Sequence, residues 1–285
     1  MFISTMSNHF SVFKYLKMVR ALNLIIVGLT QYFTAIFLLH KGLSWHLLND
    51  EKFFLLVLST VIITSAGYLI NDYYDVKIDY VNRPERVIVG RTLKRRWIII
   101  AHTIFNFLGI GIGFYISPTI GVINFIAAFL LWLYSNQLKR LPFIGNFTIA
   151  ILTGTSLFLV GQYFQEREYL VLCYAIFAGF ITLIREIIKD MEDLKGDEKF
   201  GCKTLPIVLG IAKTKQIIYG IILIFCTVVF LLMSSINIVF PITLSVIMIF
   251  LIFELLKADK IKDYGNLSTF CKVIMLMGVI SMVWI

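Results

Sequence analysis

Six aspartates form two groups with the same internal spacing. The pattern DxxDxxxD occurs twice, at relative positions 0, 3 and 7. Steps of three and seven residues return to nearly the same azimuth on an α-helix, so each group would present its carboxylates along one helix face. Crowded carboxylates repel one another, whereas Mg²⁺ accepts oxygen ligands and shares its coordination shell with substrate phosphates. The spacing therefore predicts magnesium ligands at Asp72, Asp75, Asp79, Asp190, Asp193 and Asp197.

Two further interpretations concern the geometry and the role of these groups. Gly196 lies inside the second group and could end its helix early, leaving Asp197 on an extension from which it still approaches a shared ion. Alternatively, the aspartates are solvated loop charges that pair with Lys77, Arg86, Lys189 and Lys195. Because one spacing is repeated, we favour metal sites, with catalytic carboxylates at Asp72, Asp75, Asp190 and Asp193.

The elements that carry these aspartates are expected to cross a membrane. The 285 residues are 59% hydrophobic and 15% charged, with a mean hydropathy of +0.88, whereas soluble domains carry about 25% charged residues. Nine apolar segments are candidates for spanning helices, which need roughly 17 to 25 residues. They are residues 21–40, 53–70, 97–116, 119–135, 144–163, 168–185, 215–234, 237–256 and 271–285. The sequence thus predicts an all-α, polytopic, integral membrane protein, folded as a single domain over residues 1–285.

The distribution of basic residues predicts the orientation of these spans. If nine helices alternate across the bilayer, only Lys41, Lys52 and Arg167 of the 26 Lys and Arg residues fall on the side opposite the N-terminus. Short cytoplasmic loops are enriched in basic residues, so the N-terminus is predicted to be cytoplasmic. The aspartate groups follow the second and sixth spans, which end on the same side, so both would face the cytoplasm of a plasma (inner) membrane. Such a basic face attracts anionic membrane lipids and phosphorylated substrates, and nucleic acid is not an expected partner.

Other short segments carry a resemblance to a known family. Asn71 opens the first motif, NDYYDVKID, and GCKTLP (residues 201–206) follows the second motif. Between them lie NRPERVIVGR (residues 82–91) and YSNQLKRLPFIGN (residues 134–146). With these motifs the sequence resembles, over nearly its whole length, the UbiA-type intramembrane prenyltransferases, which carry NDxxDxxxD and a second DxxD or DxxxD motif. Near the N-terminus it departs from the family's Arg-Pro-x-Asn, because Ala21 follows Arg20.

The resemblance implies a bundle of about nine transmembrane helices around a central cavity, with both aspartate motifs at its cytoplasmic end. It also implies Mg²⁺-dependent transfer of a prenyl group from an isoprenoid diphosphate donor to a lipophilic acceptor. Magnesium and cationic side chains would neutralise the departing diphosphate, and an aromatic-rich cavity would keep water from the prenyl cation. The residues expected to bind substrate are Asn71, Arg86, Tyr134, Lys139, Arg185 and Lys189.

The acceptor is the part of the reaction on which these motifs bear least. Residues 81–91 and 185–206 are most similar to the branch of the family that makes digeranylgeranylglyceryl phosphate, by geranylgeranyl transfer onto geranylgeranylglyceryl phosphate in ether-lipid synthesis. Arg185 and Lys189, one turn apart, would bind the phosphate of such an acceptor or else anchor their helix at the membrane interface. Prenylation of an aromatic acid or naphthoate in quinone synthesis is the nearest alternative, and haem farnesylation is a weaker one.

A function of another class, cation transport, also uses paired acidic residues in membrane proteins. Transport sites usually lie near the bilayer midplane at interrupted helices. All six aspartates instead follow the predicted spans directly, so transport is less favoured.

Two polar or flexible features of the third predicted span have simple packing explanations. His102 and Asn106 lie at helical spacing, and an interhelical hydrogen bond is a more common role for such a pair than contact with an acceptor. Gly109, Gly111 and Gly113 lie in an apolar span without the strand of a dinucleotide site, so they are predicted to allow close helix packing.

Overall fold

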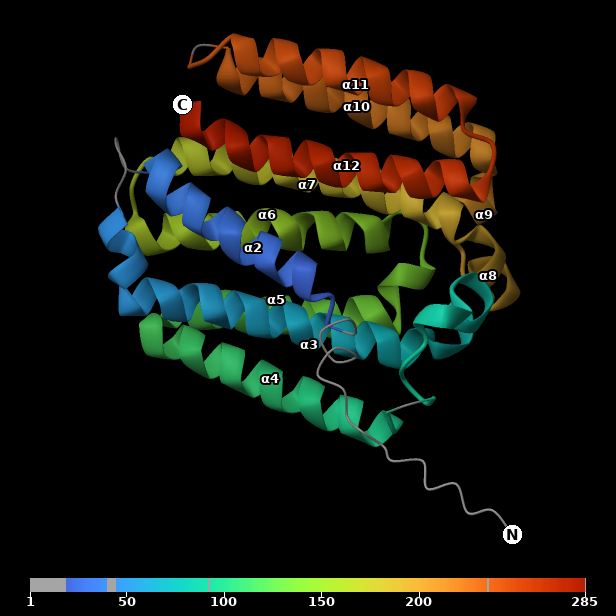
Figure 1. Ribbon diagram of the computed structural model, residues 1–285, viewed down its shortest axis with the longest axis horizontal. Helices are drawn as coiled ribbons and strands as arrows, with labels where there is room; N and C mark the ends of the chain where they lie inside the picture. Colours follow the sequence, from blue (N-terminus) through green and yellow to red (C-terminus); the bar gives the residue numbers. More distant parts are fainter. Residues whose placement is uncertain (1–18, 40–44, 92, 235, 285) are drawn as a thin grey trace, which may run out of the picture.

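The computed structural model describes residues 19–39, 45–91, 93–234 and 236–284. Within these ranges the chain is helical, and its only β-type pairing is an isolated bridge between Val89 and Leu93. In the same ranges, nine helices are long and apolar enough to cross a membrane, which confirms the predicted all-α polytopic fold. The helices lie side by side in one bundle (Figure 1).

The spanning segments follow one another with short connections. In chain order they are α2 (Ala21–Phe33) with the π-helix η1 (Thr34–Leu39), α3 (Glu51–Asn82), α4 (Arg95–Ile116), α5 (Pro118–Asn136), α6 (Ile144–Phe164), α7 (Glu168–Glu192), α10 (Ile211–Met233), α11 (Val239–Lys257), and α12 (Ile261–Ser281) with the 3-10 helix η5 (Met282–Trp284). Shorter helices occupy the connections: η2 (Trp45–Asn49), η3 (Pro84–Arg86), η4 (Leu138–Arg140), α8 (Leu194–Lys199) and α9 (Leu205–Leu209).

Three spanning helices extend further than the hydropathy of the chain predicts. α3 continues to Asn82 instead of ending near residue 70, α7 continues to Glu192 instead of residue 185, and α12 begins at Ile261 instead of residue 271. Hydropathy marks where side chains stop facing lipid, whereas the helical backbone can continue wherever its polar side chains face water or a protein cavity. As a result, the first aspartate motif is carried by a helix and Lys272 lies within a spanning helix.

Helices α3 and α7 are the most buried spans of the bundle. α7 packs against α6, α10 and α12, and α3 packs against α2, α4 and α5. The pair α10 and α11 lies beyond α7 and α12, and α4 lies on the opposite side of the bundle (Figure 1). The apolar residues of α7 that face this core, Ile181, Ile184, Ile187 and Ile188, are completely buried.

Two of the three glycines on α4 allow close helix packing, as predicted. A Cβ atom added to Gly109 would lie 2.5 Å from Ile63 Cγ1 of α3, and one added to Gly113 would lie 2.6 Å from Asn124 Nδ2 of α5. A Cβ atom added to Gly111 would meet no atom within 4 Å. The prediction is therefore confirmed for Gly109 and Gly113, and Gly111 is not needed for this packing.

The predicted interhelical hydrogen bond of His102 is also confirmed. Its Nδ1 donates to the carbonyl oxygen of Ala66 on α3 at 3.0 Å. Nε2 of the same ring then accepts from Asn106 Nδ2 at 3.1 Å. The pair thus joins α4 to α3, and neither residue lines the cavity described below.

Candidate active site

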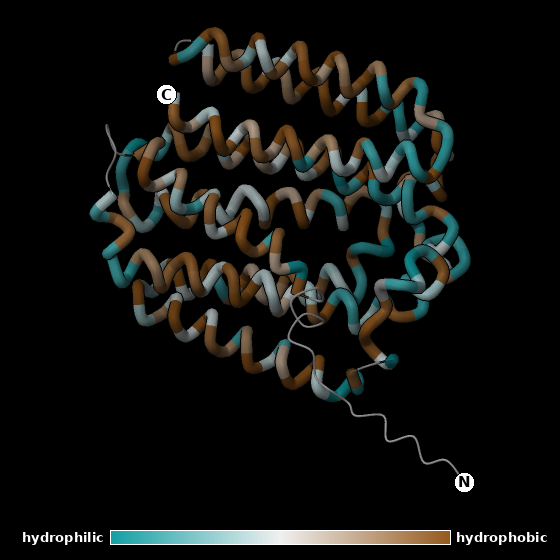
Figure 2. The backbone as a smooth tube through the Cα atoms, viewed as in Figure 1, coloured by the Kyte–Doolittle hydropathy of each residue, from teal (hydrophilic) through white to brown (hydrophobic). Residues whose placement is uncertain are grey.

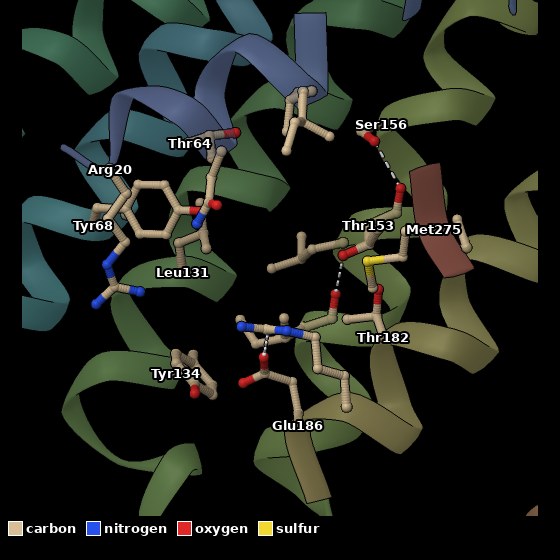
Figure 3. A pocket seen from close by; sticks show the side chains of 18 of the residues that line it. Arg20, Thr64, Tyr68, Leu131, Tyr134, Thr153, Ser156, Thr182, Glu186 and Met275 are labelled. Carbon is tan, nitrogen blue, oxygen red and sulfur yellow. Dashed lines mark hydrogen bonds and ion pairs between the residues drawn. The ribbon is translucent and has the colours of Figure 1, made fainter. Parts of the chain in front are cut away.

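A cavity of about 370 Å³ lies inside the bundle, between α2, α3, α5, α6, α7 and α12. Among the described residues, α4, α10 and α11 contribute none of its lining. The acidic lining side chains come from the ends of α3 and α7 and from α8, where polar residues also gather on the bundle (Figure 2). Elsewhere the wall is mostly apolar or hydroxylated, and Figure 3 shows Thr182 and Met275 on one side of it with Tyr68 and Leu131 on the other.

The first motif presents one face of α3 to the cavity. Asn71, Asp75 and Asp79 line it at successive steps of four residues. Asn71 Nδ2 donates to Asp75 Oδ2 at 2.8 Å, and the other oxygen of Asp75 forms an ion pair with Lys139 of η4. The polar face of α3 therefore has the spacing 0, 4 and 8, counted from Asn71.

Asp72 is the one aspartate of the two motifs that does not line the cavity. Its Oδ1 accepts a hydrogen bond from Arg20 Nη2 at 3.2 Å. The guanidinium of Arg20, which does line the cavity, also lies over the ring of Tyr68, 4.7 Å from the ring centroid. Asp72 is thus connected to the cavity through Arg20. A metal ligand would have to face the cavity directly, so the predicted metal-binding role of Asp72 stays a prediction.

The second motif is divided between two helices. α7 ends at Glu192, Asp193 follows as its C-cap, and Asp197 lies on α8. The helix therefore ends at Asp193 and not at Gly196. Because Asp197 lies on α8, the three aspartates of the second motif do not share one helix face. Asp190, Asp193 and Asp197 nevertheless all line the cavity.

Asn82 and Arg83, at the end of α3, join the two motifs. Asn82 Nδ2 donates to the Asp193 carbonyl oxygen at 3.0 Å, and Asn82 Oδ1 accepts from the Gly196 N–H at 2.9 Å. Arg83 Nη2 forms ion pairs with Asp193 Oδ1 and Glu192 Oε1, both at 2.9 Å. A side chain at position 196 would displace the Asn82 amide, because an added Cβ atom would lie 2.4 Å from Asn82 Nδ2. The motifs therefore face each other at one end of the bundle, as the even number of crossings between them predicts.

Burial and mutual repulsion both disfavour negative charge on the carboxylates at this end of the cavity. Burial raises the pKa of Asp197 to about 7, Lys139 opposes this rise, and the nearby Asp193 and Asp75 add to it. Burial likewise raises the pKa of Asp193, and the positive charges of Lys189 and Arg83 oppose this rise. Burial acts to lower the pKa of Lys139, but the Asp75 carboxylate outweighs it and the pKa is raised. An added cation would relieve the repulsion among these groups.

Three other predicted substrate-binding residues, Tyr134, Arg185 and Lys189, also line the cavity. The side chains of Arg185 and Lys189 both contact Glu186: Arg185 forms an ion pair with its Oε1, and Lys189 Nζ lies 3.5 Å from its Oε2. Tyr134 and Glu186 lie at the same end of the view in Figure 3, away from Ser156. The side chain of Arg86 lies outside the described part of the structure.

Comparison with known proteins places this chain in a family. A sequence model of the UbiA prenyltransferase family matches residues 28–278. The chain belongs to the UbiA prenyltransferase family. Digeranylgeranylglyceryl phosphate synthase of Methanosphaera stadtmanae is 31% identical to it over 229 residues, which are 79% of this chain and 84% of that protein. Family membership and the nine apolar helices among the described residues make the protein an integral, multi-pass membrane prenyltransferase.

Solved structures show that the helices are arranged in the UbiA fold. A structure of digeranylgeranylglyceryl phosphate synthase has a TM-score of 0.67 at 24% identity, covering 95% of this chain and 96% of that chain. A UbiA homologue from Archaeoglobus fulgidus bound to DMAPP and Mg²⁺ has a TM-score of 0.64 at 16% identity, covering 95% of this chain and 99% of that chain. At these identities the likeness establishes the fold.

The UbiA-type segments noted in the sequence each contribute a contact to the site. Residues 82–91 begin with the Asn82 and Arg83 that join the motifs. Residues 134–146 end with Asn146, whose Nδ2 donates to Asp190 Oδ2 at 2.8 Å. In residues 201–206, the Cys202 N–H donates to the Asp197 carbonyl oxygen at 2.9 Å. These segments therefore hold the aspartates in place.

The lining aspartates suit a magnesium ion that arrives with its substrate. Among the described residues, no three Asp, Glu, His or Cys side chains converge into a preformed metal site. Instead Lys139, Arg83 and Asn146 each hold one of the carboxylates. The available ligands are carboxylate and amide oxygens, which Mg²⁺ prefers, and a magnesium ion bound to substrate phosphates needs only one or two protein carboxylates. The residues present therefore fit the ion together with a diphosphate.

Sequence reasoning did not single out Arg83, Asn146, Glu186 or Lys272 as members of the site. Arg83 and Asn146 lie within recognised segments, and only their contacts distinguish them from neighbouring polar residues. Lys272 did carry a signal, because it is the single charge in the apolar residues 266–285. The predicted span of residues 271–285 puts this charge at a helix end, whereas α12 begins at Ile261 and Lys272 lies in the wall of the cavity.

Proposed function

We propose that this protein transfers a geranylgeranyl group from geranylgeranyl diphosphate to geranylgeranylglyceryl phosphate, with Mg²⁺ as cofactor. The observation that carries the proposal is the cavity, in which aspartates from both motifs line one end of an otherwise largely apolar wall. The name of the Methanosphaera relative supports the acceptor, and the Archaeoglobus homologue bound to DMAPP and Mg²⁺ supports the class of donor and the metal.

At the polar end, the donor diphosphate would be bound by metal and cationic groups together. Mg²⁺, when bound, would neutralise the negative charge that develops on the leaving diphosphate. Lys139 is paired with Asp75 in the free protein and would contact a phosphate oxygen once a metal takes that carboxylate. The proposed metal ligands are the aspartates that line the cavity: Asp75, Asp79, Asp190, Asp193 and Asp197.

Three residues are proposed to support this donor site without binding the metal. Asn71 holds Asp75 through its hydrogen bond. Asp72 holds Arg20 toward the cavity and is given this positioning role because it does not line the cavity itself. Arg86 remains a predicted ligand of the diphosphate.

The reaction exchanges one carbon–oxygen bond for another. The bond between prenyl C1 and the bridging oxygen breaks, its electron pair stays on the diphosphate, and an allylic cation remains. The acceptor hydroxyl oxygen bonds to C1 and loses its proton to an oxygen of the released diphosphate. The aromatic residues Tyr134 and Phe177 line the cavity, where a negative ring face would stabilise the cation, and the apolar wall would exclude water.

We further propose that the aspartate end and the N-terminus face the cytoplasm at the plasma membrane. Most Lys and Arg residues belong to that side by the alternation of the spans, which supports the orientation. The single family match over residues 28–278 supports one domain.

The acceptor is tested directly with purified protein, Mg²⁺ and radiolabelled geranylgeranyl diphosphate. Geranylgeranylglyceryl phosphate, 4-hydroxybenzoate and dihydroxynaphthoate are supplied separately, and samples containing EDTA serve as controls. We expect labelled product with the first acceptor and none with EDTA. If only an aromatic acid gave labelled product, the proposed acceptor would be wrong. Transfer that persists without magnesium would reject the proposed role of the metal.

A further inference from the structure

Lys272 is a charged residue deep inside a spanning helix. It lies about 16 Å along the axis from Ile261, the first residue of α12, by the rise of an α-helix. Its side chain lines the cavity, and no hydrogen bond or ion pair joins it to another described residue. A lysine at such depth is costly in a membrane protein and is generally found where it faces a polar ligand.

The face of α7 that lines the cavity beside Lys272 also carries polar groups without partners. Thr182, Arg185 and Lys189 line the cavity at steps of three and four residues, and Glu186 lies beside Arg185. Thr182 is 97% buried, since only 3% of it is exposed, and its Oγ1 has no hydrogen-bond partner. Arg185 Nε is likewise buried without one. Buried polar groups are nearly always paired in folded proteins, so these two donors indicate a missing ligand.

The net positive charge of this region balances the negative charge of a phosphate monoester. Arg185, Lys189 and Lys272 each carry one positive charge, and Glu186 removes one through its two ion pairs. Two positive charges remain, while a phosphate monoester carries about −1.5 to −2 at neutral pH. Arg185, Lys189 and Arg20 all act electrostatically on Lys272, so the cations share one region of the cavity.

We propose that Lys272, with Arg185, Lys189 and Thr182, forms a subsite that binds the phosphate monoester of the acceptor. This inference rests on the proposed function and assigns the part of the cavity that distinguishes a phosphorylated acceptor from an aromatic acid. Glu186 orients Arg185 and Lys189 within the subsite. Lys272 supplies the contact from α12, which packs against α7.

The subsite is separate from the donor diphosphate site along the length of the cavity. Arg185 lies about 10 Å along the axis from Glu192, the last residue of α7, whereas Asp193 and Asp197 follow that helix end. Asp193 and Asp197 thus occupy the end of the bundle, Arg185 and Lys272 lie deeper, and Lys189, the residue before Asp190, lies between the two sites. A phosphate at the deeper position leaves the aspartate end free for the metal-bound diphosphate.

Steady-state kinetics of full-length variants in detergent test the assignment. In Lys272→Met, KM for geranylgeranylglyceryl phosphate should rise about tenfold or more, because a charge-assisted contact is lost, while KM for geranylgeranyl diphosphate changes less than about twofold. Lys272→Arg keeps the charge and should retain most of the affinity. Lys262→Met, on the exposed part of the same helix, is the matched control and should change neither KM.

A binding measurement without donor or magnesium gives a second readout. Geranylgeranylglyceryl phosphate should raise the melting temperature of the wild type more than the corresponding alcohol does, and Lys272→Met should lose this difference. Because the variant removes a charge from a spanning helix, its own melting temperature should not fall. An unchanged acceptor KM, or a rise only in the donor KM, would overturn the subsite. If the wild type itself used only aromatic acids, the proposed function would fail instead.

Discussion

At the scale of single residues, Asp75 has the most contacts to test within the proposed donor site. It accepts from Asn71, pairs with Lys139 and faces the second motif across the cavity. We expect Asp75→Asn to lower kcat/KM for prenyl transfer by about 100-fold or more, the size of effect seen when one group that stabilises developing charge is removed. Asp72→Asn should cost less and leave the Mg²⁺ dependence of the rate unchanged. If both variants lost kcat/KM equally and the Mg²⁺ dependence of the rate changed in each, Asp72 would be a metal ligand.

The raised pKa of Asp197 should give the proposed metal site a pH dependence. With its pKa raised to about 7, this carboxyl is about half protonated at neutral pH, and a metal must displace the proton to bind. The affinity for Mg²⁺ should therefore increase as pH rises through about 7 and level off above it. Titration of Mg²⁺ at several pH values, with inorganic diphosphate present and thermal stability as the signal, measures this. Asp197→Asn should flatten the curve, and an equally steep curve in that variant would assign the proton to another group.

At the scale of helices, Gly109 of α4 sets the distance to α3. A Cβ atom there would lie 2.5 Å from Ile63 Cγ1 and 3.2 Å from the Ser59 carbonyl oxygen. Gly109→Val should destabilise the protein by about 1–3 kcal/mol, the usual cost of overpacking. Gly111→Val on the same helix is the matched control, because its Cβ would meet no atom within 4 Å. Thermal unfolding in detergent compares the two, and equal shifts would mean that the α3–α4 contact is not tightly packed in solution.

The helices and their order could be predicted from sequence, because lipid imposes a long apolar run on every span. Their ends could not, since the last turns of α3 and α7 carry polar residues that line an internal cavity, and the first turns of α12 carry exposed polar residues such as Lys262. The same limit applies within the motifs. The spacing of Asp72, Asp75 and Asp79 fits one face of a helix, but so does that of Asn71, Asp75 and Asp79, and only the packing of α3 selects the second. The division of the second motif likewise depends on the contacts of Asn82 with α8.

At the scale of the whole molecule, the orientation in the membrane can be measured at the two ends of the bundle. With the four native cysteines replaced by serine, Lys199→Cys reports on the aspartate end and Glu168→Cys on the other, and both positions are exposed. An impermeant maleimide should label position 199 only in inside-out vesicles and position 168 only in right-side-out vesicles. The reverse pattern would place the site outside the cytoplasm.

The contacts of Asn82 and Arg83 with the second motif should affect the rate of turnover. The helical frame of the proposed diphosphate site is assembled before any substrate arrives, because direct bonds already fix the end of α3 to the start of α8. A preassembled site holds the leaving group after reaction much as it held it before, so departure of inorganic diphosphate should be slow. We expect diphosphate with Mg²⁺ to inhibit competitively against the donor, with an inhibition constant at or below the donor KM. Inhibition much weaker than that would mean that the site tightens only around the intact substrate.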